Sequence, residues 1–241
     1  MNPPNLTLTA ATQTDLLSQL AKLDITVPLV TEGRRKEHRE QYMMARFLAT
    51  KASDLSFPLR VEHTDGPDFI LTSGSNVMGV ECVEAVPQEL YEIEVLRENE
   101  YPDAMNFGQK FRPGERTFTR EERRQVASGQ LAGSPWMPEG AKRNWIAAME
   151  YFIIGKTAKL NRGNYAAANT MWLLVQDEWP NTIQYYPKQQ LDAALRLTHC
   201  LARQLNEASF ETIFIASGSL LLAIRKQELC AQPVQDLWRD A

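Results

Sequence analysis

Residues 66–86, GPDFILTSGSNVMGVECVEAV, restrict the possible folds of this chain more than any other segment. Two apolar runs flank a polar turn at residues 73–76, which predicts a hairpin of two strands. Asp68 lies at the start of the first strand, and Glu81 lies within the second strand among apolar neighbours. A carboxylate in such surroundings costs free energy unless it is paired, hydrogen-bonded or bound to a cation. The hairpin therefore indicates a candidate site as well as a fold.

The segments around this hairpin predict an α/β fold with a mixed β-sheet between helices. The hydrophobic pattern predicts, in order, a helix, three strands, a helix, a strand, a helix and a strand, which begins with the order αβββαβ. The expected helices lie within residues 31–53, 141–160 and 191–206, and the expected strands lie at 57–64, 67–71, 77–86, 171–179 and 211–217. Residues 219–226 are a candidate for one more strand.

A single domain is expected, because 241 residues with 44% hydrophobic content supply one large core. The first 30 residues are predicted to form an N-terminal extension, loose over residues 1–10 and then a short helix ending near Leu23. We expect a core over 35–178, an insertion over 87–140, and a C-terminal helix and strands over 181–241 that complete the sheet. The acidic first part of the insertion, residues 88–100, is a candidate helix. The insertion as a whole has weak structural signals, which is typical of a functional or mobile loop.

Three widely spaced cysteines and the absence of a visible secretory signal predict a reducing, cytoplasmic location. No window approaches ~18 consecutive apolar residues, so no membrane span is expected. The net charge of −4 argues against a protein that coats nucleic acid non-specifically, but it leaves room for a local basic groove.

Several familiar motifs are absent. Gly155-Lys156-Thr157 looks like the end of a phosphate-binding loop, but the required earlier glycine is replaced by Glu150 and the tripeptide falls within a predicted helix. The three histidines are scattered along the chain, and each is interpreted as a surface or packing residue.

The predicted helices each have an apolar face. In the first, Glu40 shares that face with Met44, Phe47 and Leu48. In the second, Lys156 lies on the apolar stripe. In the third, the inward positions are predicted to be Leu191, Leu195, Cys200 and Leu205.

Pro67-Asp68 followed by Glu81-Cys82-Val83 resembles the motif of the PD-(D/E)xK nuclease superfamily, which has a restriction-endonuclease-like fold. A helix before the hairpin, and a helix then a strand after it, also resemble this superfamily. The resemblance covers about residues 35–178. It implies a metal-dependent phosphodiester hydrolase, a DNA endonuclease, with Mg²⁺ or Mn²⁺ held by Asp68, Glu81 and Glu40.

Val83 occupies the position of the superfamily's lysine, which orients or deprotonates the attacking water. One interpretation is that this lysine has moved to another element, with Lys156 as the candidate and Lys159 as the alternative. Another is that the chain keeps the fold but has lost catalysis. It would then be an interaction module such as an immunity, regulatory or assembly protein.

Each acidic residue also has a purely structural interpretation. Asp68 fits a turn cap after Gly-Pro, Glu81 a buried ion pair with a residue such as Arg60, and Glu40 an ordinary helix residue. Glu62 and Glu84 are expected on the opposite face or the rim.

An arginine-rich segment within the insertion is a candidate nucleic-acid contact, because arginine grips phosphate with two parallel hydrogen bonds. A solvated surface is an equally good interpretation, since acids are interspersed. Phe111 and Phe118 are candidates for stacking on bases. The candidate cations are Lys110, Arg112, Arg116, Arg120, Arg123 and Arg124. DNA is the expected partner, and the apolar run at 219–224 fits either a homodimer surface or a core strand.

Overall fold

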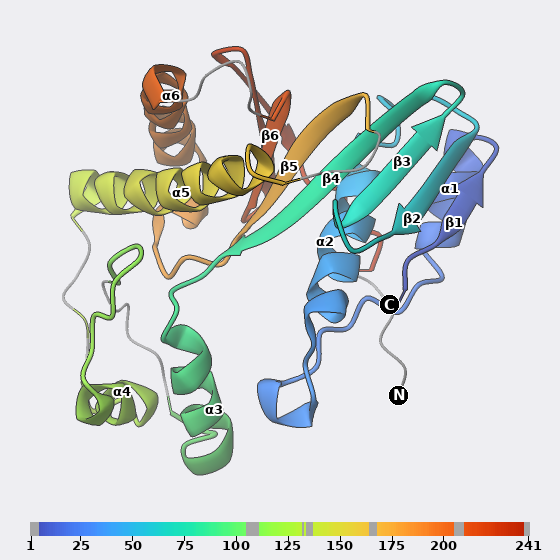
Figure 1. Ribbon diagram of the computed structural model, residues 1–241. Helices are drawn as coiled ribbons and strands as arrows, with labels where there is room; N and C mark the ends of the chain where they lie inside the picture. Colours follow the sequence, from blue (N-terminus) through green and yellow to red (C-terminus); the bar gives the residue numbers. More distant parts are fainter. Residues whose placement is uncertain are drawn as a thin grey trace.

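The computed structural model describes residues 5–104, 111–131, 133, 137–163, 168–204 and 210–238. Its centre is one mixed sheet of eight strands that follow each other in chain order (Figure 1). The strands are β1 (Leu8–Ala10), β2 (Leu59–His63), β3 (Phe69–Ser73), β4 (Asn76–Ala85), β5 (Thr170–Asp177), β6 (Thr212–Ser217), β7 (Leu220–Arg225) and β8 (Glu228–Pro233). The described residues form the α-helices α1 (Gln13–Leu20), α2 (Lys36–Lys51), α3 (Leu90–Glu100), α4 (Arg120–Ala127), α5 (Pro138–Leu160) and α6 (Pro187–Gln204).

The centre of the sheet is parallel and its two sides are antiparallel. β4 pairs with β5 and β5 with β6 in parallel, whereas the strands from β1 to β4 and from β6 to β8 form antiparallel meanders. Parallel neighbours need a crossover connection, and α5 and α6 lie on the two connections that end at β5 and β6. The prediction of an α/β fold with a mixed sheet is confirmed.

Two hydrophobic cores lie on opposite faces of the sheet. One includes Leu16 of α1, Met44 and Leu48 of α2, and the strand residues Leu71 and Val80. The other joins α5 and α6 to the sheet through residues such as Trp145, Ile153 and Leu197. In Figure 1, α1 and α2 lie on one side of the strands and α5 and α6 on the other. The central strand β4 is therefore covered on both faces, as its continuous apolar sequence predicts.

The predicted hairpin forms between β3 and β4. Ser73 pairs with Asn76 across the turn, and Gly74 takes a left-handed conformation with φ of +60°, which glycine adopts without steric cost. Phe69 pairs with Val80. This register places Asp68, one residue before β3, beside Glu81 of β4.

The predicted insertion contains more regular structure than its sequence suggests. It includes α3 and α4, and α4 begins with a capping box in which Thr119 and Glu122 satisfy each other's backbone N–H groups. The two helices pack beside each other below the sheet in Figure 1. The candidate helix at 88–100 is confirmed by α3, whereas α4 occupies part of the segment that was expected to have weak structure.

The predicted inward face of α6 is also wrong. Leu191 and Leu195 are 38% and 46% exposed, whereas the buried face includes Ala193, Leu197 and Leu201. Spacing alone did not distinguish a leucine pair on the surface from the small alanines that allow α6 to approach the sheet. Cys200 is half-buried, and Leu205 lies outside the described residues.

The two ends of the chain extend the sheet. Residues 8–10, expected to be loose, form β1, which pairs with β2 and buries Leu8 and Ala10. Near the other end, β7 lies between β6 and β8, and its Leu221, Leu222 and Ile224 are buried. The apolar run at 219–224 is therefore a core strand.

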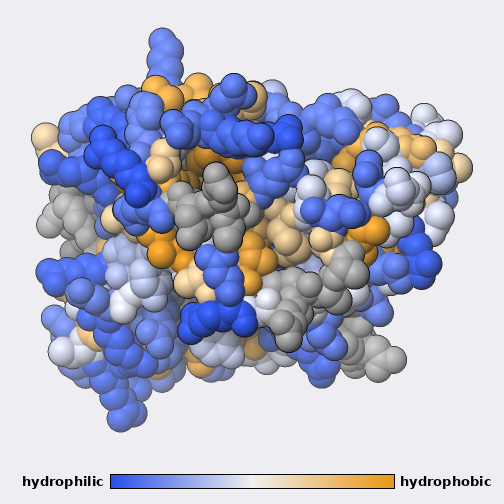
Figure 2. Space-filling view, turned by 45° about the horizontal axis from the view of Figure 1, so that its top comes forward, coloured by the Kyte–Doolittle hydropathy of each residue, from blue (hydrophilic) through white to orange (hydrophobic). Residues whose placement is uncertain are grey.

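The surface seen in Figure 2 is mostly hydrophilic, with apolar side chains showing mainly in a central strip between polar ones. Within the described part of the chain, no helix is both long enough and apolar enough to cross a membrane.

Candidate functional site

Two buried carboxylates from separate elements meet at one lysine. Glu40 projects from α2 and Asp68 from the residue before β3, and their side chains are 5% and 4% exposed. Lys36 Nζ lies 2.5 Å from Glu40 Oε1 and 2.7 Å from Asp68 Oδ1. We call Glu40 and Asp68 the carboxylate pair. The prediction that Glu40 faces the apolar side of its helix is confirmed.

The sequence explains this arrangement. Lys36 precedes Glu40 by four residues, so their side chains lie on the same face of α2. The Asp68 side chain is held in place by β4, because the backbone N–H of Cys82 donates a 2.7 Å hydrogen bond to its Oδ2. The Asp68 carboxylate thus stabilises the pairing of β3 with β4, and its other oxygen faces Lys36.

The members of the carboxylate pair titrate differently. Burial raises the pKa of Glu40, and the neighbouring Asp68 carboxylate raises it further. Burial also opposes the charge on Asp68, but hydrogen bonds from Lys36 and Cys82 outweigh it and lower the pKa of Asp68. Lys36 is partly desolvated, yet both carboxylates raise its pKa, so it stays charged. Glu40 is therefore the member that takes up a proton first.

His63 completes this cluster. Its Nε2 lies 2.9 Å from Glu40 Oε2, and its ring packs on Phe69 with 4.9 Å between the ring centroids. His63 ends β2, directly opposite Phe69 on β3. The interpretation of this histidine as a packing residue covers its ring contact but misses its contact with Glu40.

Glu81 forms a second buried charge pair, on the side of β4 that faces α5. Its side chain is 3% exposed, and Lys156 Nζ of α5 donates a 2.7 Å hydrogen bond to its Oε1. Lys159, one turn further along α5, lies 3.6 Å from the same oxygen and is much more exposed. Lys156 therefore points inward to a carboxylate, which is the placement expected of it. Arg60 instead pairs with Glu62.

Cys82 lies between the two charge clusters. Its side chain belongs to the α1–α2 core, whereas the neighbouring Val83 packs with the α5–α6 core. Burial raises the pKa of the Cys82 thiol well above its ordinary value, and the carboxylates Asp68, Glu40 and Glu81 add to this effect. The thiol therefore stays neutral. Cys82 separates the carboxylate pair from Glu81.

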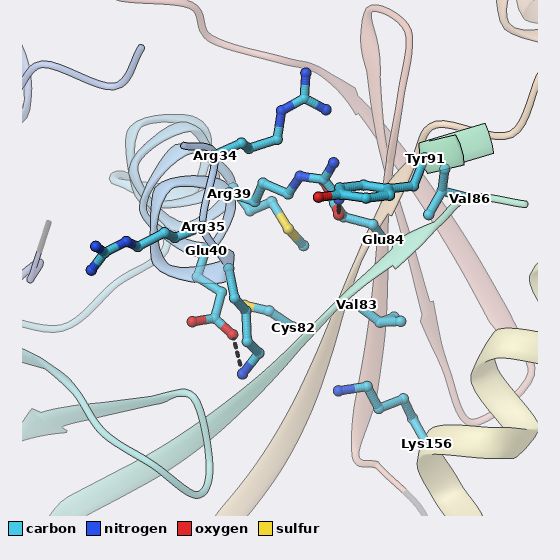
Figure 3. Close-up of a pocket in the computed structure, with 12 residues that line it drawn as sticks. Arg34, Arg35, Arg39, Glu40, Cys82, Val83, Glu84, Val86, Tyr91 and Lys156 are labelled. Atoms are coloured by element: carbon cyan, nitrogen blue, oxygen red, sulfur yellow. Dashed lines mark hydrogen bonds and ion pairs between the residues drawn. The ribbon is translucent and has the colours of Figure 1, made fainter. Parts of the chain in front are cut away.

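A pocket of about 370 Å³ opens beside this region (Figure 3). Its lining includes Glu40 of α2, Cys82 and Val83 of β4, and Lys156 of α5. In Figure 3, Lys156 extends towards this space from α5. The pocket thus gives access from solvent to both charge clusters.

The remaining arginines around this pocket already have acidic partners. Arg39 pairs with Glu84, and Arg34 lies 3.0 Å from Glu94. Burial raises the pKa of Glu84, and Arg39 counters this effect. The pocket wall therefore carries paired charges rather than an open basic patch, and Glu84 is part of that wall.

The arginine-rich segment packs against α3 through ion pairs. Arg116 and Arg123 contact Glu92, and Arg124 contacts Glu100. Arg123 is nearly buried and also donates to the carbonyl of Phe118. These contacts join α4 to α3, which gives most of the segment a structural role.

The other candidates of that segment are placed as follows. Phe111 is buried, with Phe118 and Trp179 packed edge-on against it, so Phe111 does not present a stacking surface. Arg112 is exposed and lies 3.7 Å from Glu115. Arg120 begins α4 as an exposed residue, and Lys110 lies outside the described residues.

The structure thus brings the predicted residues together as two neighbouring pairs, Glu40 with Asp68 and Glu81 with Lys156. Lys36 and His63 join the first pair and were not predicted. The spacing of four residues between Lys36 and Glu40 was a usable signal, whereas nothing in the local sequence marks His63. No group of three or more metal-ligating side chains in metal-binding geometry occurs among the residues that the structure describes.

Neither protein-family models, nor curated proteins, nor solved structures gave a significant match to this chain.

Proposed function

We propose that this protein is a metal-dependent phosphodiester hydrolase, a DNA endonuclease of the PD-(D/E)xK type. The observation that carries the proposal is the placement of three buried carboxylates, Glu40, Asp68 and Glu81, on one helix and one hairpin beside an inward lysine, Lys156. Burying a carboxylate costs free energy. Titratable groups perturbed by burial and by nearby charges cluster at active sites.

The order of the elements supports the same proposal. α2 is followed by the antiparallel strands β2, β3 and β4, and after α3 and α4 the chain continues with α5 and the parallel strand β5. In the proposal, we take this stretch as the αβββαβ core of the superfamily that the motif resembles, with α3 and α4 as an insertion. Glu40, Asp68, Glu81 and Lys156 lie on its first helix, hairpin and second helix.

The donor set suits a hard cation. Carboxylate oxygens are the ligands that Mg²⁺ and Mn²⁺ prefer, and the carboxylate pair already converges on one positive group, the Lys36 ammonium. In the proposal, Glu40, Asp68 and Glu81 hold the metal ion. A bound metal supplies polarisation of the phosphodiester and activation of a water.

The chain's own residues then have distinct roles. Asp68 stays ionised, because Lys36 and the Cys82 N–H lower its pKa. Lys156, held at Glu81, is placed to hydrogen-bond a water near that carboxylate. Arg112 and Arg120 of the arginine-rich segment remain the exposed candidates for contact with the DNA backbone.

Incubation with plasmid DNA and Mg²⁺ or Mn²⁺ tests this function. The wild-type protein is expected to nick or linearise the plasmid, and Asp68→Asn is expected to lose this activity. Glu62→Gln is a matched control, because Glu62 is an acid of the nearby strand β2 whose ion-pair partner among the described residues is Arg60. Equal lack of cleavage by the wild-type protein and Asp68→Asn, over varied DNA and RNA substrates, would refute the proposal.

A second candidate is a non-enzymatic interaction module with the same fold. It is favoured by the pairing of the buried carboxylates with Lys36 and Lys156, which balances their charge without a metal, and by Val83 at the position of the motif lysine. Calorimetric binding of Mn²⁺ that disappears in Glu81→Ala would argue against this candidate.

A further inference from the structure

The Lys36 ammonium contacts one oxygen of each carboxylate in the pair. It is 2.5 Å from Glu40 Oε1 and 2.7 Å from Asp68 Oδ1. The contact with Asp68 is a hydrogen bond. The contact with Glu40 is an ion pair without hydrogen-bond geometry, and Glu40 Oε1 accepts no hydrogen bond from any described residue.

This difference matters because an ammonium group has directional donors, whereas a metal ion attracts oxygen ligands from any direction that its coordination number allows. Lys36 therefore gives Asp68 both a hydrogen bond and a positive charge, whereas it gives Glu40 a positive charge alone. A buried carboxylate oxygen without a hydrogen bond is a costly arrangement, which a cation between the two carboxylates would relieve.

The anchoring of the three residues is unequal. The Lys36 side chain is 68% exposed, whereas Glu40 and Asp68 are held in place by His63 and by the backbone of β4. Because the lysine side chain is exposed, a competing cation can reach this contact from solvent. Leaving the two buried carboxylates without a positive charge is costly, so the ammonium moves away only when another cation replaces it.

From these contacts we infer that Lys36 is an internal counter-ion that occupies the cation position of the carboxylate pair, so that a divalent metal binds only when Lys36 is displaced. Lys36 stabilises the metal-free protein and weakens metal binding. This inference rests on the proposed function, because it assigns the cation to the same carboxylates.

Titration calorimetry of the purified full chain with MnCl₂ tests this inference. Lys36→Gln is expected to bind Mn²⁺ about fivefold or more tightly than the wild-type protein, because the competing ammonium is removed from the carboxylate pair. Arg35→Gln is a matched control, since it removes the adjacent positive charge, and among the described residues Arg35 forms no ion pair with either carboxylate. Its affinity should change much less.

A melting experiment provides a second readout that does not depend on catalysis. Mn²⁺ should raise the melting temperature of Lys36→Gln more than that of the wild-type protein, and Lys36→Arg, which keeps the charge, should resemble wild type. Tighter binding by Lys36→Gln alone supports the inference, even if the wild-type protein cleaves no DNA and the proposed function fails.

Two results would overturn the inference. Mn²⁺ binding by the wild-type protein that is equal or weaker in Lys36→Gln would show that the ammonium does not compete, while leaving the nuclease proposal intact. Absence of Mn²⁺ binding in both proteins would show that the carboxylate pair is not a cation site.

Discussion

Replacing Lys156 with methionine removes the main partner of a buried carboxylate while keeping most of the side-chain volume. Glu81 would remain 3% exposed, with only Lys159 within ion-pair distance, at 3.6 Å. The loss of one partner from a fully buried ion pair costs about 3–5 kcal/mol. Lys156 is 18% exposed and Lys159 partly replaces it, so we expect Lys156→Met to lower the free energy of unfolding by about 2 kcal/mol.

Lys159→Met is the matched control on the next turn of the same helix. Lys159 is 67% exposed and its contact with Glu81 is longer, so its loss should cost less than about 0.5 kcal/mol. Adding Glu81→Gln to Lys156→Met removes the unpaired buried charge. The double variant should therefore be more stable than Lys156→Met alone.

Urea unfolding followed by circular dichroism measures these free energies. The reasoning would be refuted if Lys156→Met were no more destabilising than Lys159→Met, or if Glu81→Gln lowered the stability of Lys156→Met further. Either result would mean that Glu81 does not depend on Lys156 for its charge balance, and Lys156 would lose its assigned position in the site.

Two further predictions concern the packing around the sheet. Burial raises the pKa of Asp177 to about 6, so its charged form is disfavoured in the folded protein. The free energy of unfolding should therefore fall as pH rises from about 4 to about 6. Asp177→Asn should remove up to about 3 kcal/mol of this fall, measured in unfolding experiments at each pH. Leu71→Ala should lower the free energy of unfolding by about 3–5 kcal/mol, because Leu71 is fully buried between β2 and β4. Leu195→Ala on the exposed face of α6 should cost less than about 1 kcal/mol by the same assay, and equal effects of the two substitutions would contradict the assignment of the core.

The central features of the fold were predictable because they are local. The turn at 73–76 and its apolar flanks predicted β3 and β4, and the face shared by Glu40 and Met44 placed Glu40 inward on α2. The inward direction of Lys156 followed from its position on the stripe of α5. These are inferences from helix and strand periodicity, which the tertiary structure preserves.

The missed features depend on contacts between distant segments. β1 forms because residues 8–10 find a partner in β2, about 50 residues away. His63 enters the site because β2 lies beside α2 in space, which no local pattern shows. The exposed side of α6 was mistaken for its core side, because alanines contribute less to a hydrophobic pattern than leucines.

The arginine-rich segment shows a different limit of sequence reasoning. Alternating arginines and glutamates fit both a phosphate-binding arm and a set of ion pairs, and the choice depends on where the acids of α3 lie. In the structure, Glu92 and Glu100 lie against Arg116, Arg123 and Arg124. Composition describes the charges of such a segment, and only the fold determines their partners.

The location of bound metal tests the central claim most directly. Anomalous diffraction from a crystal soaked in Mn²⁺ should show a peak within ligand distance of Glu40 and Asp68 and close to Glu81, with the Lys36 side chain turned out into solvent. The absence of a peak at high Mn²⁺ concentration, with Lys36 still bridging the carboxylate pair, would contradict the assignment of these residues to a metal-dependent active site.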